Sequence, residues 1–106
     1  MSEAPLPALP DIDIGIASDS ETGIDPPCKV IIHNDDVTPM DFVIEVLVGV
    51  FDLAVGSATA VMLEAHHNGR AHVVTLGREE AKHRVGQAHQ LSRAAGYPLS
   101  FTIEPD

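Results

Sequence analysis

Cysteine and aromatic residues are scarce in this chain of 106 residues, which has one cysteine, no tryptophan, one tyrosine and three phenylalanines. The single cysteine, Cys28, cannot form an internal disulfide, which indicates a reducing compartment such as the cytoplasm. No basic segment followed by an apolar stretch opens the chain, so we expect no signal peptide. Every apolar run is too short to cross a bilayer, so we expect no membrane partner. Any core must be largely aliphatic.

Basic residues are also few, with six Lys and Arg against 16 Asp and Glu and a formal charge of −10. Six of the acids and none of the bases lie in residues 1–26. Phosphate binding requires clustered Lys and Arg, so nucleic acid is not expected as a partner. An acidic surface favours cationic groups instead.

The chain divides into two parts. Residues 1–27 carry five prolines and six acids, and such a segment cannot bury enough apolar surface to offset the entropy of ordering. We predict a flexible, acidic, proline-rich N-terminal extension over residues 1–27. Residues 28–106 are long enough for one compact domain, which we expect to be a monomer.

The domain is predicted to have the element order β-α-α-β-α-β. Short apolar runs predict strands over residues 28–33, 70–76 and 99–103, and helical patterns cover residues 39–53, 55–67 and 77–95. Gly69 is a natural left-handed cap for the second helix. Strands separated by helices in so short a chain predict an α/β (α+β) fold, in which a small three-stranded sheet packs with three helices.

The segment from His33 to Val43 contains the most distinctive pattern. Thr38 is predicted to be the N-cap of the first helix, with Pro39 at the first helical position. The carboxylate of Asp41 is predicted to accept the backbone N–H of Thr38. Asn34, Asp35 and Asp36 then occupy the turn between a strand and a helix N-terminus. The pattern alone is typical either of an ordinary turn with a cap or of a polar binding site.

The motif Asn34-Asp35-Asp36-x-Thr38-Pro39-Met40-acid-Phe-Val resembles the signature of the ClpS family. Further motifs, Met62-Leu63-x-x-His66-x-x-Gly69 and Tyr97-Pro98-Leu99, resemble that family in the same order. The resemblance covers Lys29 to Asp106. It implies an adaptor without catalytic activity, metal or cofactor. Such an adaptor binds the N-terminal residues Phe, Tyr, Trp or Leu of substrate proteins. It delivers them to the N-terminal domain of a ClpA- or ClpC-like AAA+ unfoldase.

A protein N-terminus is a cation with N–H donors, so it requires acceptors and preferably one anion. An amide oxygen, carboxylates and a neutral imidazole nitrogen are available from Asn34, Asp35, Asp36 and His66. The first side chain requires an apolar slot beside them. Its candidate wall residues are Ile32, Thr38, Met40, Val43, Met62, Ala65 and Leu99.

Two positions depart from the family pattern. Ala65 stands where Val is usual, which predicts a wider slot, and His33 stands where an aliphatic residue is usual, which predicts a polar wall. The resemblance also assigns Glu79 and Arg84 to the surface that contacts the unfoldase. A solvated helix face is the alternative interpretation of these two residues.

Two other functions remain open from the residues alone. Six histidines (33, 66, 67, 72, 83 and 89) with Asp35 and Asp36 could suggest a metal site or hydrolase. However, their spacing matches no zinc motif. A scaffold-type interaction domain, such as that of the ribosomal stalk, could share the same small architecture, since fold alone does not decide function.

Overall fold

The structure is a computed structural model that describes residues 25–106. It confirms the predicted order of six elements and the α/β class. The elements are β1 (Pro27–His33), α1 (Met40–Gly49), α2 (Val55–Asn68), β2 (Arg70–Gly77), α3 (Arg78–Ala94) and β3 (Ser100–Pro105). The predicted N-terminal extension falls mainly on residues 1–24, which lie outside the described residues. β1 begins at Pro27, one residue before the predicted domain boundary.

The sheet has the strand order β2-β1-β3, and both pairs are antiparallel. The register between β1 and β2 shifts where Val30 pairs with Val74 and Ile31 with His72. Val73 is therefore an extra residue, a β-bulge, which places two successive valines toward the core. Val73 is buried and Val74 packs against the core. β1 is therefore the central strand, paired with both β2 and β3. It ends at His33, and the turn that contains Asn34, Asp35 and Asp36 follows directly.

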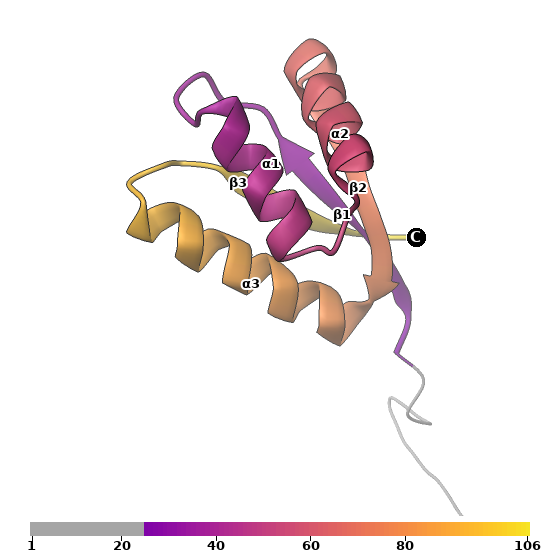
Figure 1. Ribbon diagram of the computed structural model, residues 1–106. Helices are drawn as coiled ribbons and strands as arrows, with labels where there is room; N and C mark the ends of the chain where they lie inside the picture. Colours follow the sequence, from indigo (N-terminus) through magenta and orange to yellow (C-terminus); the bar gives the residue numbers. More distant parts are fainter. Residues whose placement is uncertain (1–24) are drawn as a thin grey trace, which may run out of the picture.

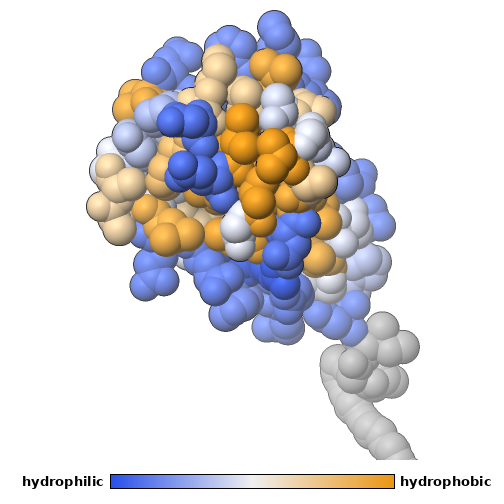
Figure 2. Space-filling view, in the orientation of Figure 1, coloured by the Kyte–Doolittle hydropathy of each residue, from blue (hydrophilic) through white to orange (hydrophobic). Residues whose placement is uncertain are grey.

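All three helices cover one face of the sheet (Figure 1). Val30 and Ile32 of β1 are almost fully buried against them. In the same orientation, hydrophobic and strongly hydrophilic surface lie side by side over the helices (Figure 2). On α1, Asp41 and Glu45 are exposed, whereas Leu47 on the opposite side has no exposed surface. The amphipathic pattern therefore places α1 correctly.

The first helix is shorter than the predicted range of residues 39–53. It ends at Gly49, and Asp52 adopts a left-handed conformation with φ of 59°. A non-glycine residue at positive φ ends helical geometry, so the chain turns here into α2. The second helix ends as predicted, with Gly69 at φ 88° donating its N–H to the carbonyl of Ala65. The carbonyl of Gly69 in turn accepts the N–H of Asn34 at 2.9 Å.

The N-terminus of α3 is capped by a residue far away in sequence. The N-cap position is Gly77, which has no side chain to offer. Instead, both carboxylate oxygens of Asp25 accept the N–H of Glu79, at 3.2 and 3.0 Å. A Cβ at position 77 would collide with that carboxylate, so glycine leaves the space that Asp25 fills. Pro26 adds a second link, since its carbonyl accepts the N–H of Arg78.

Candidate functional site

A cavity of about 140 Å³ lies where the end of β1, the following turn, α1, α2 and the segment before β3 meet. The structure brings every predicted amine-binding and slot residue to this cavity. His33, predicted to form a polar part of the wall, also lines the cavity. The lining residues are Ile32, His33, Asn34, Asp35, Asp36, Thr38, Met40, Val43, Met62, Ala65, His66 and Leu99.

Asp35 organises the turn at the mouth of this cavity. Its Oδ1 accepts the backbone N–H of Val37 at 2.9 Å and that of Thr38 at 2.7 Å, and its Oδ2 accepts the Thr38 hydroxyl at 2.9 Å. Burial by itself would raise the pKa of Asp35. The bonds from Thr38 and Val37, with the positive charge of Arg93, outweigh it and hold the pKa below its ordinary value. Asp35 is thus held as an anion.

These bonds correct the predicted helix cap. No side chain within residues 25–106 caps α1, and the N-cap position is Pro39 instead of Thr38. The Thr38 hydroxyl donates to Asp35 instead of accepting from the helix. The Asp41 carboxylate accepts the N–H of its neighbour Phe42 and not the N–H of Thr38. The cap prediction was wrong because an Asp three residues before a Thr can close its own turn and compete for the same groups.

Three acceptors at the cavity have no partner within residues 25–106. The side chains of Asn34, Asp36 and His66 make no hydrogen bond to any part of the chain that the structure describes, and all three residues are exposed. Asp35 uses three of the roughly four lone-pair positions of a carboxylate, which leaves one on Oδ2. The cavity mouth therefore offers a group of acceptors, two of them carboxylates, to a cation with several N–H donors.

The wall of the cavity is apolar and mostly buried. Ile32, Val43, Met62, Ala65 and Leu99 are each 8% exposed or less. Met40 is also part of the lining but is 46% exposed, so it lies at the rim. A thioether at the rim adapts to side chains of different shape.

His33 is a polar wall residue whose ring is already engaged. Its Nε2 lies 2.7 Å from the hydroxyl of Thr102 on β3. The two side chains fix each other across neighbouring strands, where His33 pairs with Ser100. The predicted polar wall is therefore present, but one nitrogen of the ring is occupied by the protein itself.

Sequence reasoning missed Arg93, which supports the cavity without lining it. Its Nη1 donates to the carbonyl of Leu99 at 2.8 Å and to that of Tyr97 at 3.0 Å. A basic residue in the last turn of a helix commonly bonds nearby carbonyls. That local signal, just before Gly96, could have indicated its role.

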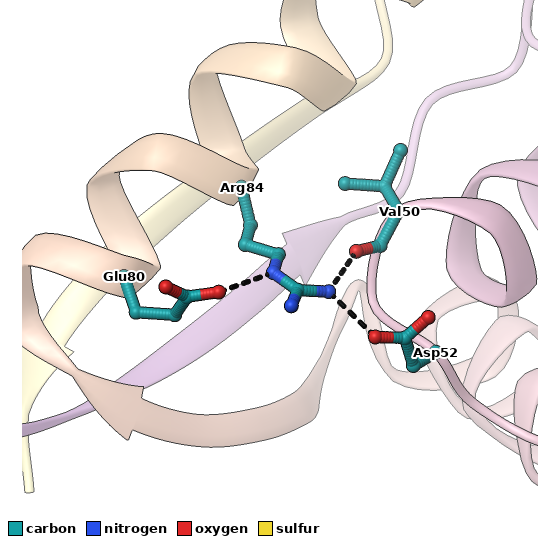
Figure 3. A network of polar contacts seen from close by, with 4 residues as sticks. All are labelled: Val50, Asp52, Glu80 and Arg84. Carbon is teal, nitrogen blue, oxygen red and sulfur yellow. Dashed lines mark hydrogen bonds and ion pairs between the residues drawn. The ribbon is translucent and has the colours of Figure 1, made fainter.

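The two residues predicted to face the unfoldase lie on α3 and do not line the cavity. Arg84 donates to Glu80 at 2.6 Å, to the carbonyl of Val50 at 2.6 Å and to Asp52 at 2.8 Å (Figure 3). The hydrogen bonds that Arg84 donates to the carboxylates of Asp52 and Glu80 raise the pKa of Arg84. Glu79 is more open, with 77% of its side chain exposed and Lys82 at 3.8 Å.

Metal chemistry finds no support in residues 25–106, where no group of three or more His, Cys, Asp and Glu side chains is placed to hold an ion. Nor does any helix of this region have the length and apolar character needed to cross a membrane. The arrangement suits non-covalent binding of a cation joined to an apolar group.

The sequence of this chain is similar to those of known protease adaptors. Residues 24–102 match the family described as "ATP-dependent Clp protease adaptor protein ClpS". The adapter protein ClpS of Vibrio atlanticus is 44% identical over 85 residues, which is 78% of this chain and 80% of that protein. ClpS 1 of Rhodopseudomonas palustris is 45% identical over 78 residues, or 74% of this chain and 76% of that protein.

A solved structure also resembles this fold. Agrobacterium tumefaciens ClpS2, described as bound to L-phenylalaninamide, superposes with a TM-score of 0.75 at 40% identity. The match covers 78% of this chain and all of that one. These similarities favour the protease adaptor over the stalk-type scaffold. With most of its length matched in sequence and in fold, this chain belongs to the ClpS family, whose members are named adaptors of the Clp protease and not enzymes.

Proposed function

We propose that this protein captures substrates through their N-terminal residue. The α-amine would bind the acceptors of Asn34, Asp35, Asp36 and His66, and a large hydrophobic first side chain would enter the cavity. The observation that carries this proposal is the position of the Asp35 carboxylate, anchored by three hydrogen bonds at the mouth of an apolar cavity. Acceptors without a partner in residues 25–106 line the same cavity as this anion. An ammonium group would donate hydrogen bonds to these acceptors and pair with the negative charge.

The apolar wall supports the second half of the proposal. Burial of a Leu or Phe side chain contributes about 1.5–3 kcal/mol. The buried residues of the cavity wall, Ile32, Val43, Met62, Ala65 and Leu99, are all apolar. The ligand of Agrobacterium ClpS2, L-phenylalaninamide, combines a free α-amine with an aromatic side chain. That ligand has the two groups that this cavity is proposed to bind, and it supports Phe as a first residue. We extend the proposal to Tyr, Trp and Leu, which are also large and hydrophobic.

Delivery is the second part of the proposed function. We infer that the N-terminal domain of a ClpA- or ClpC-like unfoldase binds α3, through Glu79 and Arg84, while the monomeric adaptor holds its cargo in the cytoplasm. The exposed carboxylate of Glu79 is available to a partner. Arg84 already donates hydrogen bonds to Glu80, Asp52 and the carbonyl of Val50. We therefore expect Glu79 to contribute more to the contact with the unfoldase.

Fluorescence anisotropy with peptides that differ only in residue 1 tests capture. Peptides beginning with Phe, Tyr, Trp or Leu should bind, and those beginning with Ser or Asp should not. Acetylation of the Phe peptide removes its charge and leaves the acceptors unpaired, which should weaken binding by about thirty- to hundredfold. Equal affinity for free and acetylated peptides would refute amine recognition.

Delivery requires a separate assay with a reconstituted unfoldase and protease. Glu79→Ala should slow degradation of a Phe-starting substrate while the peptide Kd stays within about twofold, because Glu79 does not line the cavity. Glu64→Ala, which removes an exposed acid from α2, is the matched control. If both variants deliver at the wild-type rate, α3 is not the unfoldase surface.

A further inference from the structure

Within residues 25–106, Leu99 is the one cavity residue that lies beyond α2 in the chain; the others come from β1, the turn after it, α1 and α2. Leu99 is 1% exposed, so the ligand side chain can meet it only from inside the cavity. It belongs to the connection between α3 and β3, which no strand pairing holds. Something else must fix its distance from the opposite wall.

Backbone hydrogen bonds define the start of this connection. Gly96 adopts φ of 82°, and the N–H of Tyr97 bonds the carbonyl of Ser92 at 2.8 Å while that of Gly96 bonds the carbonyl of Arg93. This is the Schellman pattern, which ends a helix in a defined direction. The ring of Tyr97 then stacks edge-on against Phe42 of α1, with centroids 4.9 Å apart. The connection is thereby attached to the helix that supplies Val43.

Arg93 extends this fixed geometry to Leu99. One guanidinium nitrogen, Nη1, has two N–H groups, and it donates to the carbonyls of both Tyr97 and Leu99. The two carbonyls therefore converge on one rigid planar group. The bond to Leu99 is partly buried, where loss of a donor leaves the carbonyl unsatisfied.

We propose that Arg93 is the positioning residue of the apolar wall: by holding the Tyr97 and Leu99 carbonyls, it sets where Leu99 stands in the cavity and thus the preference among first side chains. The inference rests on the proposed capture of N-terminal residues. The same guanidinium acts electrostatically on Asp35. Arg93 therefore influences both the apolar wall and the amine-binding anion, and the two effects can be separated by substitution.

Two substitutions separate them. Arg93→Lys keeps the positive charge but loses the planar fork, so Leu99 is released while the effect on Asp35 remains. Arg93→Gln loses both. The control is Arg78→Gln, an equal loss of charge at an exposed arginine on the same helix whose side chain makes no hydrogen bond within residues 25–106.

The readout is the ratio of Kd values for Leu- and Phe-starting peptides, with the acetylated Phe peptide measured in parallel. Both Arg93 variants should change the Leu/Phe ratio by about three- to tenfold, below or near the effect of one whole methylene group. Arg93→Lys should keep the wild-type ratio of the affinity for the free peptide to that for the acetylated one. Arg93→Gln should raise that ratio, because it removes a positive charge that acts on Asp35 and opposes binding of the ammonium group. Arg78→Gln should leave both ratios unchanged. A purely structural role would lower the melting temperature without changing the Leu/Phe ratio.

Wild-type protein provides a measurement that does not depend on the folding of variants. Titration with L-leucinamide and with L-phenylalaninamide should shift the NMR signal of the Arg93 side chain by different amounts. The two ligand side chains differ in shape, so they should displace Leu99 differently, and Leu99 is hydrogen-bonded to Arg93. If folded variants keep the wild-type Leu/Phe ratio, or if both ligands leave Arg93 unmoved, the inference is wrong. If wild-type protein binds neither peptide, the proposed function itself fails.

Discussion

Arg84 of α3 and Asp52 of the α1–α2 turn form an ion pair of 2.8 Å that links the helix to the turn. The same nitrogen of Arg84 also holds the carbonyl of Val50. Asp52 is the one non-glycine residue at positive φ in residues 25–106. The pair therefore supports a backbone conformation that is unfavourable for most residues.

Arg84→Gln should lower the melting temperature by several degrees, since it removes the bonds to Asp52, Glu80 and the carbonyl of Val50. Thermal unfolding followed by circular dichroism measures this. Arg78→Gln, with the same change of charge, should have little effect. A wild-type melting temperature for Arg84→Gln would show that the network contributes nothing, and Arg84 would then be free for the unfoldase.

Substitutions of Asp35 should separate its charge from its structural bonds. Asp35→Asn keeps an amide oxygen for the N–H groups of Val37 and Thr38, so stability should change little while the Phe peptide binds about tenfold more weakly, the loss of one charge-assisted contact. Asp35→Ala should also reduce the free energy of unfolding by about 1 kcal/mol, as for a lost cap. Urea unfolding and anisotropy measure the two effects. If Asp35→Asn binds at full strength, the anion is not required.

Ala65→Val tests the predicted width of the slot. Ala65 is 4% exposed and lines the cavity, so two added methyl groups reduce the space for a ligand. The Kd for a Trp-starting peptide should rise more than that for a Leu-starting one, because the larger ring fills more of the cavity. Ala60→Val, an exposed position on the same helix, is the control for helix propensity. An equal change for both peptides would mean that Ala65 does not limit size.

Asp25 should stabilise the domain although it precedes every strand and helix of residues 25–106. Loss of its bond to the Glu79 N–H should cost about 1 kcal/mol, or roughly 4–8 °C for a domain of this size. Proteins lacking residues 2–24 and 2–25 differ only in this residue, and the second should melt at the lower temperature. Asp25→Asn, which keeps an acceptor, should resemble wild type. Equal melting of both truncated proteins would contradict this cap. Peptide affinity should stay within about twofold in both, since no cavity residue is removed.

Stability should fall in mild acid because of His89. Its Nε2 accepts the N–H of Phe101 at 3.0 Å and so must be unprotonated. Burial, and then the positive charge of Arg93, lower the pKa of His89. The unfolded chain thus binds this proton at a higher pH than the folded chain. The stabilisation is complete above about pH 6.5 and is lost as pH falls from there toward the folded pKa.

The melting temperature should therefore decrease between pH 7.5 and pH 5, and His89→Gln, which keeps an acceptor, should reduce that decrease. His83→Gln, at an exposed position of α3, should not. Asp35 acts in a separate window: its lowered pKa means that its contribution is lost only at more acidic pH, below about 4. An unchanged acid response in His89→Gln would assign the effect to other groups.

The residues predicted for the site meet at one cavity because local geometry fixes their positions. Met62 and His66 are four residues apart on α2, so they share one face. Asn34 and Asp35 follow a buried strand directly. Once strand and helix were identified, those positions could only converge on one end of the sheet, where the cavity is found.

Contacts between distant segments were not predictable in the same way. Asp25 caps a helix that begins more than fifty residues later, and no local pattern marks such a pair. The β-bulge at Val73 was not predictable either, because the apolar pattern of β2 is the same as that of a strand without a bulge. The wrong cap at Thr38 shows a related limit, because Thr38 suits either of two hydrogen-bond arrangements and only the whole turn decides between them.

The central position of β1 leaves β3 as an edge of the sheet. An edge strand exposes N–H and C=O groups that can recruit a strand from another molecule. On β3, the N–H of Phe101 is already bound to His89, and the strand ends at Pro105, which has no N–H to donate. A helix side chain thus replaces a fourth strand as edge protection, and β3 is a poor template for intermolecular β-sheet growth and aggregation.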